Sequence, residues 1–465
     1  MEIKKKKIEV LATYRNKIMT LKSFFYKGHE RSVNAKRNIL FSFGIKGLNI
    51  LISLILVPLT IDYINPTRYG IWLTLSSIIG WLSFFDIGFG NGLRNKFAEA
   101  LAAGDKELAR KYVSTTYAVL AIIISVVLII FVCVNPFLNW AKILNTPPEM
   151  VAELSVLALI VFVFFCLQFV LQLITTIITA NQQSAKASFY NLLGSIFSLI
   201  IIYVLTKTTQ GNLLYLGYAL GLTPVVVLGV SSIYFFNGEY KYYAPSIKYV
   251  KFSYTKDLMG LGLKFFLIQI SAIVLFQSNN IIISQLFGPE QVTPYNITYK
   301  YFGVITMIAG IIMTPLWSAY TEAWVKKDFE WIKQTVRKLQ YLWLLLFGLS
   351  LFMLVVSPFV YHFWLGDKVK ISFSLSAIMC LYGLVIVWNM IFVYFLNGVG
   401  KIRLQLYSSF FGTIMTIPLT YYFATVFGII GIIVASCILG LINTLWTYLQ
   451  YSKLVSQTAK GIWNE

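Results

Sequence analysis

Cysteine and histidine are scarce in this chain of 465 residues, which contains four cysteines and two histidines. The cysteines lie inside apolar runs, far apart in the sequence, at Cys133, Cys166, Cys380 and Cys437. Cysteines in such positions are expected to pack as small apolar side chains rather than to form disulfides or bind metal. The histidines, His29 and His362, share no motif with a cysteine or with one another. We therefore predict no metal site and no cofactor.

Motifs that carry catalytic chemistry are also missing from the sequence. It contains no Walker lysine loop, no Asp-x-Asp motif and no plausible Ser/His/Asp set. The longest loop expected outside the cytoplasm, at about residues 135–153, is too short to hold more than a small active site. We therefore predict no catalytic residues and a protein that is not an enzyme.

Acidic residues are few, since 18 aspartates and glutamates stand against 38 lysines and arginines and the net charge is +20. A strongly basic chain can bind nucleic acid. Here, however, the basic residues recur in alternate segments between apolar runs, which is typical of membrane topology. We therefore predict no nucleic-acid partner.

Long apolar runs dominate the rest of the chain. Hydrophobic residues make up 58% of it and charged residues only 12%, and the mean hydropathy is +0.74. A transmembrane helix needs about 20 consecutive apolar residues. The expected fold class is an all-α polytopic membrane protein with twelve transmembrane helices, at about residues 38–61, 70–92, 113–135, 152–180, 187–206, 212–236, 260–286, 296–318, 339–361, 373–398, 404–425 and 428–451.

The distribution of lysine and arginine predicts the orientation of these helices. Most basic residues fall in the segments that share one side with the N-terminus, which is the cytoplasmic side under the positive-inside rule. The basic leader, residues 1–37, has no apolar core followed by a cleavage site, so we expect no cleaved signal peptide. We predict a multi-pass protein of the bacterial inner membrane with both termini in the cytoplasm.

Two short patterns occur twice, at nearly equal separations along the chain. Glu99-Ala100, Asp105 and Glu107 return as Glu322-Ala323, Asp328 and Glu330, and Gly44-Ile45-Lys46 returns as Gly262-Leu263-Lys264. Two such matches indicate an internal repeat. Because each half would hold six helices, the halves would be related by a pseudo-twofold axis along the membrane normal, as in transporters built from parallel repeats.

This repeat predicts five segments. They are a cytoplasmic basic N-terminal segment at 1–37, a six-helix bundle at 38–236, a cytoplasmic linker at 237–259, a second six-helix bundle at 260–451 and a cytoplasmic tail at 452–465.

The first predicted helix carries a polar stripe. Its polar residues recur at helical spacing and fall on one face: Asn38, Ser42, Lys46, Asn49 and Ser53. A polar stripe on a spanning helix must face protein or water rather than lipid. Lys46 can face a water-filled lumen or extend to the cytoplasmic surface. We assign Lys46 and Asn49 to a substrate-binding lumen.

The seventh and eighth predicted helices supply further lumen candidates. Lys264 begins a polar face on the seventh helix, and Asn280 belongs to a second polar face of the same helix. A buried amide can bind substrate or hold helices together, and the spacing favours neither. Lys300 lies at the outer start of the eighth helix.

Carboxylates inside the spans are rare, and Asp86 is the candidate for coupling to an ion gradient. It can equally pair with Arg94 or cap the backbone of the glycine-rich segment that follows it. Glu322 is a second coupling candidate, although it can serve only the repeated loop. We place Asn91 and Arg94 at the cytoplasmic mouth, where Arg94 can attract an anionic headgroup.

Four segments resemble a known family, namely Tyr69–Leu73, Asp86–Lys96, Pro315–Ala323 and Leu396–Lys401. Together they are similar to bacterial O-antigen and polysaccharide flippases (Wzx-type translocases), in the superfamily of multidrug/oligosaccharidyl-lipid/polysaccharide (MOP) exporters that includes the MATE transporters. The likeness extends from about residue 38 to residue 451. Asn397, in the last segment, joins the lumen candidates.

The resemblance implies a secondary transporter that flips a polyprenyl-pyrophosphate-linked oligosaccharide from the cytoplasmic to the outer leaflet, coupled to an ion gradient. Its partners would be this lipid-linked substrate, the bilayer and other polysaccharide assembly proteins. Relatives often carry an acid where this chain has Asn279 or Asn280, so coupling here would use another group or none.

Two alternatives stay open. A MATE-type multidrug exporter would favour an acidic, aromatic lumen, and a membrane-embedded polysaccharide polymerase would share the substrate.

Overall fold

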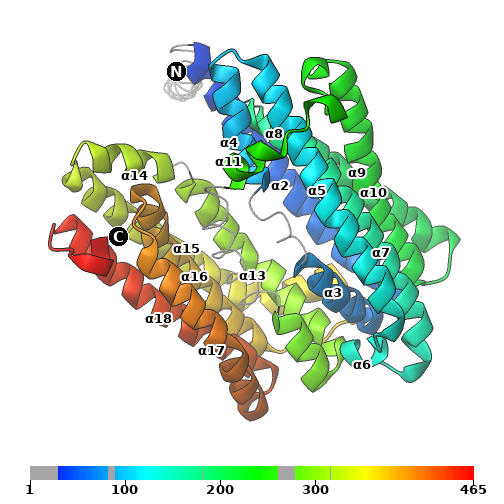
Figure 1. Ribbon diagram of the computed structural model, residues 1–465. Coiled ribbons are helices and arrows are strands. Elements are labelled where there is room, and N and C mark those ends of the chain that lie inside the picture. Colours follow the sequence, from blue (N-terminus) through cyan, green and yellow to red (C-terminus); the bar gives the residue numbers. More distant parts are fainter. Residues whose placement is uncertain (1–29, 82–88, 182, 260–277, 315, 465) are drawn as a thin grey trace, which may run out of the picture.

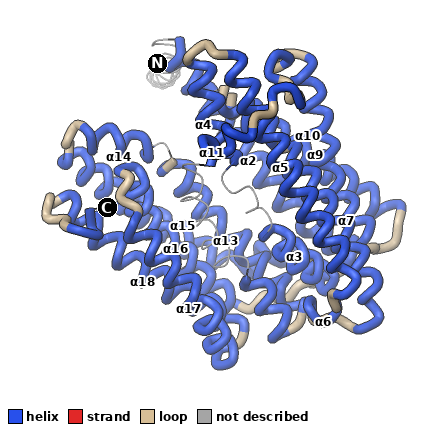
Figure 2. The backbone as a smooth tube through the Cα atoms, viewed as in Figure 1, coloured by secondary structure: helices blue, strands red, loops and turns tan. Residues whose placement is uncertain are grey.

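A computed structural model describes the chain except for residues 1–29, 82–88, 182, 260–277, 315 and 465. The regular structure in the described part consists of helices, and no strand occurs there (Figure 2). The expectation of an all-α protein is therefore confirmed for these residues.

The first half of the chain forms one group of helices, on the right in Figure 1. Its members are α2 (Glu30–Ile64), α3 (Pro66–Gly80), α4 (Phe89–Ala102), α5 (Lys106–Val134), α6 (Trp140–Leu144), α7 (Val151–Leu171), α8 (Leu173–Ala180), α9 (Ser184–Thr208), α10 (Leu213–Asn237) and the short α11 (Thr255–Met259).

The second half forms the other group, on the left in Figure 1. It begins with helical residues 278–287. The helices that follow are α13 (Val292–Met313), α14 (Leu316–Val325), α15 (Phe329–Leu365), α16 (Phe373–Val399), α17 (Arg403–Phe427) and α18 (Ile429–Val455).

Ten helices in the described part are long and apolar enough to cross a membrane. They correspond to ten of the twelve predicted spans, including the closely spaced pair at 404–425 and 428–451, which are α17 and α18. The other two predicted spans, 70–92 and 260–286, include residues outside the described ranges. The count of twelve and the boundaries of the two halves therefore stay predictions.

The buried apolar side chains form three clusters, and the one centred on the first half also includes Ile297, Tyr361 and Leu365 of the second. One cluster of buried side chains includes Leu75, Leu157 and Ile177, while two others in the second half include Ile391 and Ile432. The two groups of helices meet around α3, α6 and α13 and lie further apart near α4 and α14 (Figure 1). We call these two ends of the molecule the α3 end and the α4 end.

The repeated acidic loop has a local structural cause. Asp105 caps α5 by accepting a hydrogen bond from the backbone N–H of Leu108 at 2.9 Å. Asp328 caps α15 in the same way, through the N–H of Trp331 at 3.1 Å. An aspartate at this position satisfies one of the free N–H groups of the first helical turn. The repeat therefore marks two equivalent helix junctions.

A polar cluster joins α9 to the end of α10. Glu239 accepts hydrogen bonds from Lys186 and Gln183, both at 2.7 Å, and Asn181 donates to the buried Tyr240 hydroxyl at 3.0 Å. Partial burial raises the pKa of Glu239, but the hydrogen bonds from Lys186 and Gln183 outweigh it and hold that pKa below its usual value.

The replacement Glu239→Gln is expected to lower stability at pH 7 but not near pH 2, where the carboxyl group is protonated in the folded and the unfolded protein. A carboxylate with a lowered pKa stabilises the fold above its unfolded value of about 4.3 and loses this effect as the pH falls through the folded value. Because Glu239 and Lys186 are 40% and 41% exposed, solvent screens the pair, and the cost should be about 1 kcal/mol or less. Thermal unfolding in detergent at both pH values measures this loss of stability. The control is Glu149→Gln, at an exposed position. An equal loss at both pH values would contradict the assignment.

Candidate functional site

A cavity of about 1130 Å³ lies between the two halves of the molecule. Four helices line it: α2, α9, α13 and α16. Its polar lining residues are Lys46, Asn49, Ser53, Ser188, Ser195, Tyr299, Lys300, Thr306, Thr314 and Tyr382. The remaining lining residues are apolar or glycine, so the lining of the cavity is partly polar and partly apolar.

The polar stripe of α2 forms one wall of this cavity. Lys46, Asn49 and Ser53 all line it, and the side chain of Lys46 is exposed there. They are brought together by the helical repeat, because residues three and four apart lie on one face. Lys300 reaches the same cavity from α13 in the other half.

The cavity is positively charged. It is lined by two lysines, and no aspartate or glutamate is among the described residues that line it. No salt bridge found in the described part of the chain involves either lysine. Two unpaired ammonium groups in a partly apolar cavity favour an anionic ligand, because charges interact more strongly where the effective dielectric constant is low.

Asn280 lies elsewhere, at a contact between the halves. Its side-chain N–H donates to the Ser77 hydroxyl on α3 at 2.6 Å, and its oxygen accepts from Asn296 at 2.8 Å. It is buried and is not among the residues that line the cavity. Of the two roles that the spacing left open, these contacts favour the one that holds helices together.

Of the other predicted site residues, the structure describes the side chains of Asn397 and Arg94, and neither is among the residues that line the cavity. Asn397 lies near the end of α16, where its carbonyl accepts from Gly400 N–H at 3.3 Å. Arg94 is exposed on α4, which also contains Asn91, and Glu322 lies in α14. Lys264 and Asp86 lie outside the described residues.

A set of hydrogen bonds at the α3 end joins the halves. Each pairs a side chain of one half with a backbone oxygen of the other. They are Thr293 to Pro66 at 2.7 Å, Ser284 to Leu144 at 2.7 Å, Gln285 to Ile143 at 2.6 Å, Asn145 to Ser284 at 2.8 Å and Trp364 to Leu54 at 2.9 Å. Lys368 also pairs with Asp62. The α3 end is therefore closed by direct contact.

Gly70 allows α3 to pack closely against the second half at the α3 end. A Cβ atom at this position would lie 1.8 Å from the carbonyl oxygen of Pro289. Only glycine allows the backbones of α3 and the other half to approach so closely. In the sequence, Gly70 stands out only as part of the family-like segment Tyr69–Leu73. A glycine within an apolar helix was the available signal of close packing.

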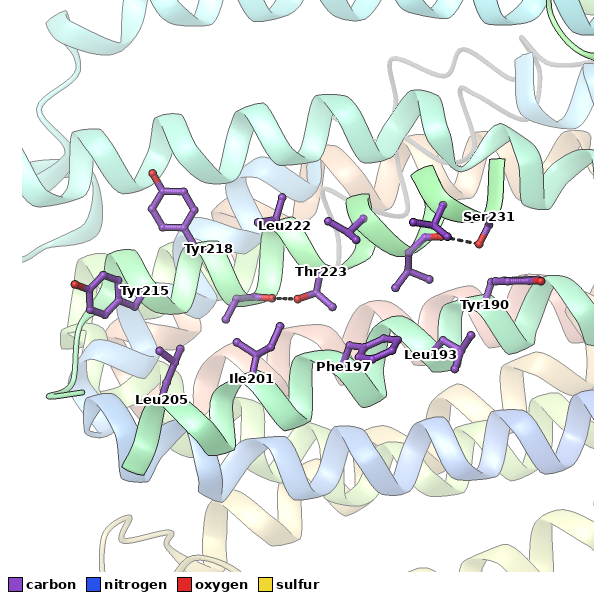
Figure 3. A pocket seen from close by; sticks show the side chains of 14 residues that line it. Tyr190, Leu193, Phe197, Ile201, Leu205, Tyr215, Tyr218, Leu222, Thr223 and Ser231 are labelled. Atoms are coloured by element: carbon purple, nitrogen blue, oxygen red, sulfur yellow. Dashed lines mark hydrogen bonds between the residues drawn. The ribbon is translucent and has the colours of Figure 1, made fainter. Parts of the chain in front are cut away.

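A second cavity, of about 640 Å³, lies between α9 and α10 (Figure 3). Its walls are mainly aliphatic and aromatic, with Phe197, Ile201 and Leu222 among them. Five of its lining residues carry hydroxyl groups: Thr223 and Ser231, which donate to backbone carbonyls within their own helix at 2.5 and 2.6 Å, and Tyr190, Tyr215 and Tyr218. No charged residue is among the described residues of this lining, so the cavity suits hydrocarbon better than a phosphate.

Comparisons with known families and proteins match most of the chain. Residues 35–320 match the model of a family described as polysaccharide biosynthesis protein, and residues 265–422 match the MatE family. A putative O-antigen export protein of Yersinia pseudotuberculosis is 22% identical over 87% of this chain and 92% of its own length. A putative O-antigen transporter of Salmonella typhi is 20% identical over 85% and 90%.

Solved structures show the fold. The inward-facing structure of a multidrug resistance MATE family transporter of the MOP superfamily matches with a TM-score of 0.73 at 16% identity, covering 91% of this chain and all of that one. The outward-facing conformation of a transporter with the same description matches with a TM-score of 0.62, covering 92% and 96%. The predicted MATE-like fold is therefore confirmed.

Proposed function

Since the chain belongs to the polysaccharide biosynthesis protein family, we propose that it is a flippase that moves a polyprenyl-pyrophosphate-linked oligosaccharide across the bacterial inner membrane. The observation that carries this proposal is the cavity between the halves, with two lysines and no described carboxylate in its lining. Its substrate would be anionic and amphipathic, and relatives of similar length are named for O-antigen export and transport.

The residues of the cavity suit the headgroup of such a lipid. Lys46 and Lys300 would neutralise the pyrophosphate, since a diphosphate cannot cross about 30 Å of hydrocarbon without a counter-charge. Asn49, Ser188 and Thr306 offer hydrogen-bonding groups to sugar hydroxyls. The described lining of the cavity between α9 and α10 has no charged residue that could bind the pyrophosphate, so the headgroup belongs between the halves.

The contacts at the α3 end support an alternating-access mechanism. In this state the halves are joined around Asn280 and Thr293. Under the orientation predicted from the basic residues, this end faces outward and the α4 end faces the cytoplasm. The headgroup would enter from the cytoplasm and leave after the contacts at the α3 end separate. Asp86 and Glu322 remain the candidates for coupling this motion to an ion gradient.

A multidrug exporter is the second candidate, because the solved structures with this fold include a multidrug resistance MATE family transporter. Cationic drugs would need acidic partners in the binding cavity, and the described lining residues include none. The charge of the cavity thus favours the anionic lipid. We also infer that other assembly proteins of the same polysaccharide act before and after this step.

Reconstitution tests the proposed function directly. The purified protein in liposomes should increase the exposure of a lipid-pyrophosphate-linked oligosaccharide on the opposite leaflet, at a rate well above that of protein-free liposomes. A pH or sodium gradient should change the rate if an ion is coupled. Protein that elongates the sugar chain instead of moving the lipid would be a polymerase, and the proposal would then be wrong.

A further inference from the structure

The segment that follows α10 lies as a strap across α5. This strap, residues 238–258, contains three short turns, η4 (Lys241–Tyr243), η5 (Ile247–Tyr249) and η6 (Phe252–Tyr254), and ends in α11 (Figure 1). All of it lies within the predicted linker, residues 237–259, and the structure packs it against the first half.

Hydrogen bonds hold the strap to α5. The backbone N–H of Ser246 donates to the Ser114 hydroxyl at 3.1 Å, and that of Lys251 donates to the Thr115 hydroxyl at 3.0 Å. Arg110 donates to the carbonyl of Ala244 at 3.1 Å, and its guanidinium lies 4.3 Å from the centre of the Tyr249 ring. The strap therefore has a definite position along α5.

This position along α5 corresponds to the edge of the hydrocarbon core of the bilayer. The charged first turns of α5 end at Lys111, and the apolar part runs from Val113 to Val134. At 1.5 Å per residue this part is about 33 Å long, close to the thickness of a bilayer core. Ser114 and Thr115 lie at its start, so the strap bonded to them lies where hydrocarbon meets headgroups.

The strap exposes apolar and cationic side chains together. Ile247 is 92% exposed and Phe252 is 60% exposed, although both are large hydrophobic residues. Four lysines on the strap are also exposed, at Lys241, Lys248, Lys251 and Lys256. Of its two acidic residues, Glu239 is paired with Lys186, which leaves Asp257. Apolar groups beside clustered lysines are typical of surfaces that bind anionic bilayers.

We propose that the strap is a binding surface for anionic phospholipid headgroups. Ile247 and Phe252 insert among the first carbons of the acyl chains, and Lys241, Lys248 and Lys251 bind the phosphate groups above them. The surface belongs to the outside of the first half, so the inference does not depend on what the central cavity carries.

Site-specific quenching in liposomes tests this proposal with the full chain. Ile247→Cys would be made in a background with the four native cysteines replaced by alanine, and labelled with a fluorophore. The liposomes would be phosphatidylcholine with a minor spin-labelled component, either phosphatidylglycerol or phosphatidylcholine. The control is Ala103→Cys, which is exposed on the same half but further from the apolar part of α5.

Quenching at position 247 should exceed that at position 103 with either lipid. It should also be about twofold stronger with spin-labelled phosphatidylglycerol than with spin-labelled phosphatidylcholine. The triple variant Lys241→Gln/Lys248→Gln/Lys251→Gln should remove that preference and leave the apolar insertion in place. Equal quenching by both lipids in the protein with native lysines would overturn the proposal that these lysines recognise anionic headgroups. No quenching at 247 above that at 103 would overturn the interfacial position.

Discussion

The double variant Lys46→Gln/Lys300→Gln is expected to reduce the initial rate of lipid translocation by about a hundredfold. Both lysines line the cavity between the halves, and the described lining contains no other lysine and no arginine that could replace their charge. A hydrogen bond to a charged group contributes about 1.5–3 kcal/mol, and each 1.4 kcal/mol is about tenfold in binding. The liposome assay with a pyrophosphate-linked oligosaccharide measures the loss.

A matched control separates this effect from a change in net charge. Lys142→Gln/Lys207→Gln removes the same charge from two exposed positions outside the cavity and should translocate at a near-native rate. Lys46→Arg/Lys300→Arg keeps both charges and should retain more activity than the glutamine variant. If the glutamine variant moved the lipid as fast as the native protein, the cationic cavity would not be the binding site.

The variant Gly70→Ala is expected to prevent closure of the α3 end and to abolish most of the transport. Its Cβ would lie 1.8 Å from the carbonyl oxygen of Pro289, a backbone atom that cannot turn aside. Overpacking of this kind costs about 1–3 kcal/mol or more, which is enough to shift a two-state equilibrium by about tenfold or more. The halves should then remain apart at this end.

Spin labels at Thr67 and Lys370 report the separation directly, because both residues are exposed at the α3 end on opposite halves. The distance distribution should lengthen in Gly70→Ala. Gly80→Ala is the control in the same helix, since a Cβ at Gly80 meets no atom within 4 Å. Unchanged distances and transport in Gly70→Ala would show that the close approach at Gly70 is not needed for closure.

The cavity could be foreseen in part because one of its walls is a local property of a helix. Lys46, Asn49 and Ser53 share a face through spacing alone, and the structure places all three on the cavity. Their role in binding stays a prediction. The caps at Asp105 and Asp328 could also have been predicted from the sequence, because an aspartate that precedes a helix with an acidic residue in its first turn is a known signal for the start of a helix. The repeat in the sequence thus reflects two equivalent helix caps.

Asn280 shows why the rest could not be foreseen. Its place on a polar face of the seventh predicted helix was compatible with substrate binding and with helix packing. Only its partners decide between these roles, and one of them, Ser77, is 203 residues away. The close approach of Gly70 to Pro289 depends in the same way on how the halves meet. Sequence spacing carries no information about such distant pairs.

The sequence by itself determined the class of protein, the position of most spans and the face on which the α2 stripe lies. These follow from local rules, because a helix in a bilayer satisfies its backbone within one segment and needs about 20 apolar residues. Only the tertiary structure decided which polar faces share a cavity and which lock the halves together at the α3 end. Those outcomes depend on contacts between the two halves, such as Thr293 with Pro66, which form only when both bundles have folded and docked.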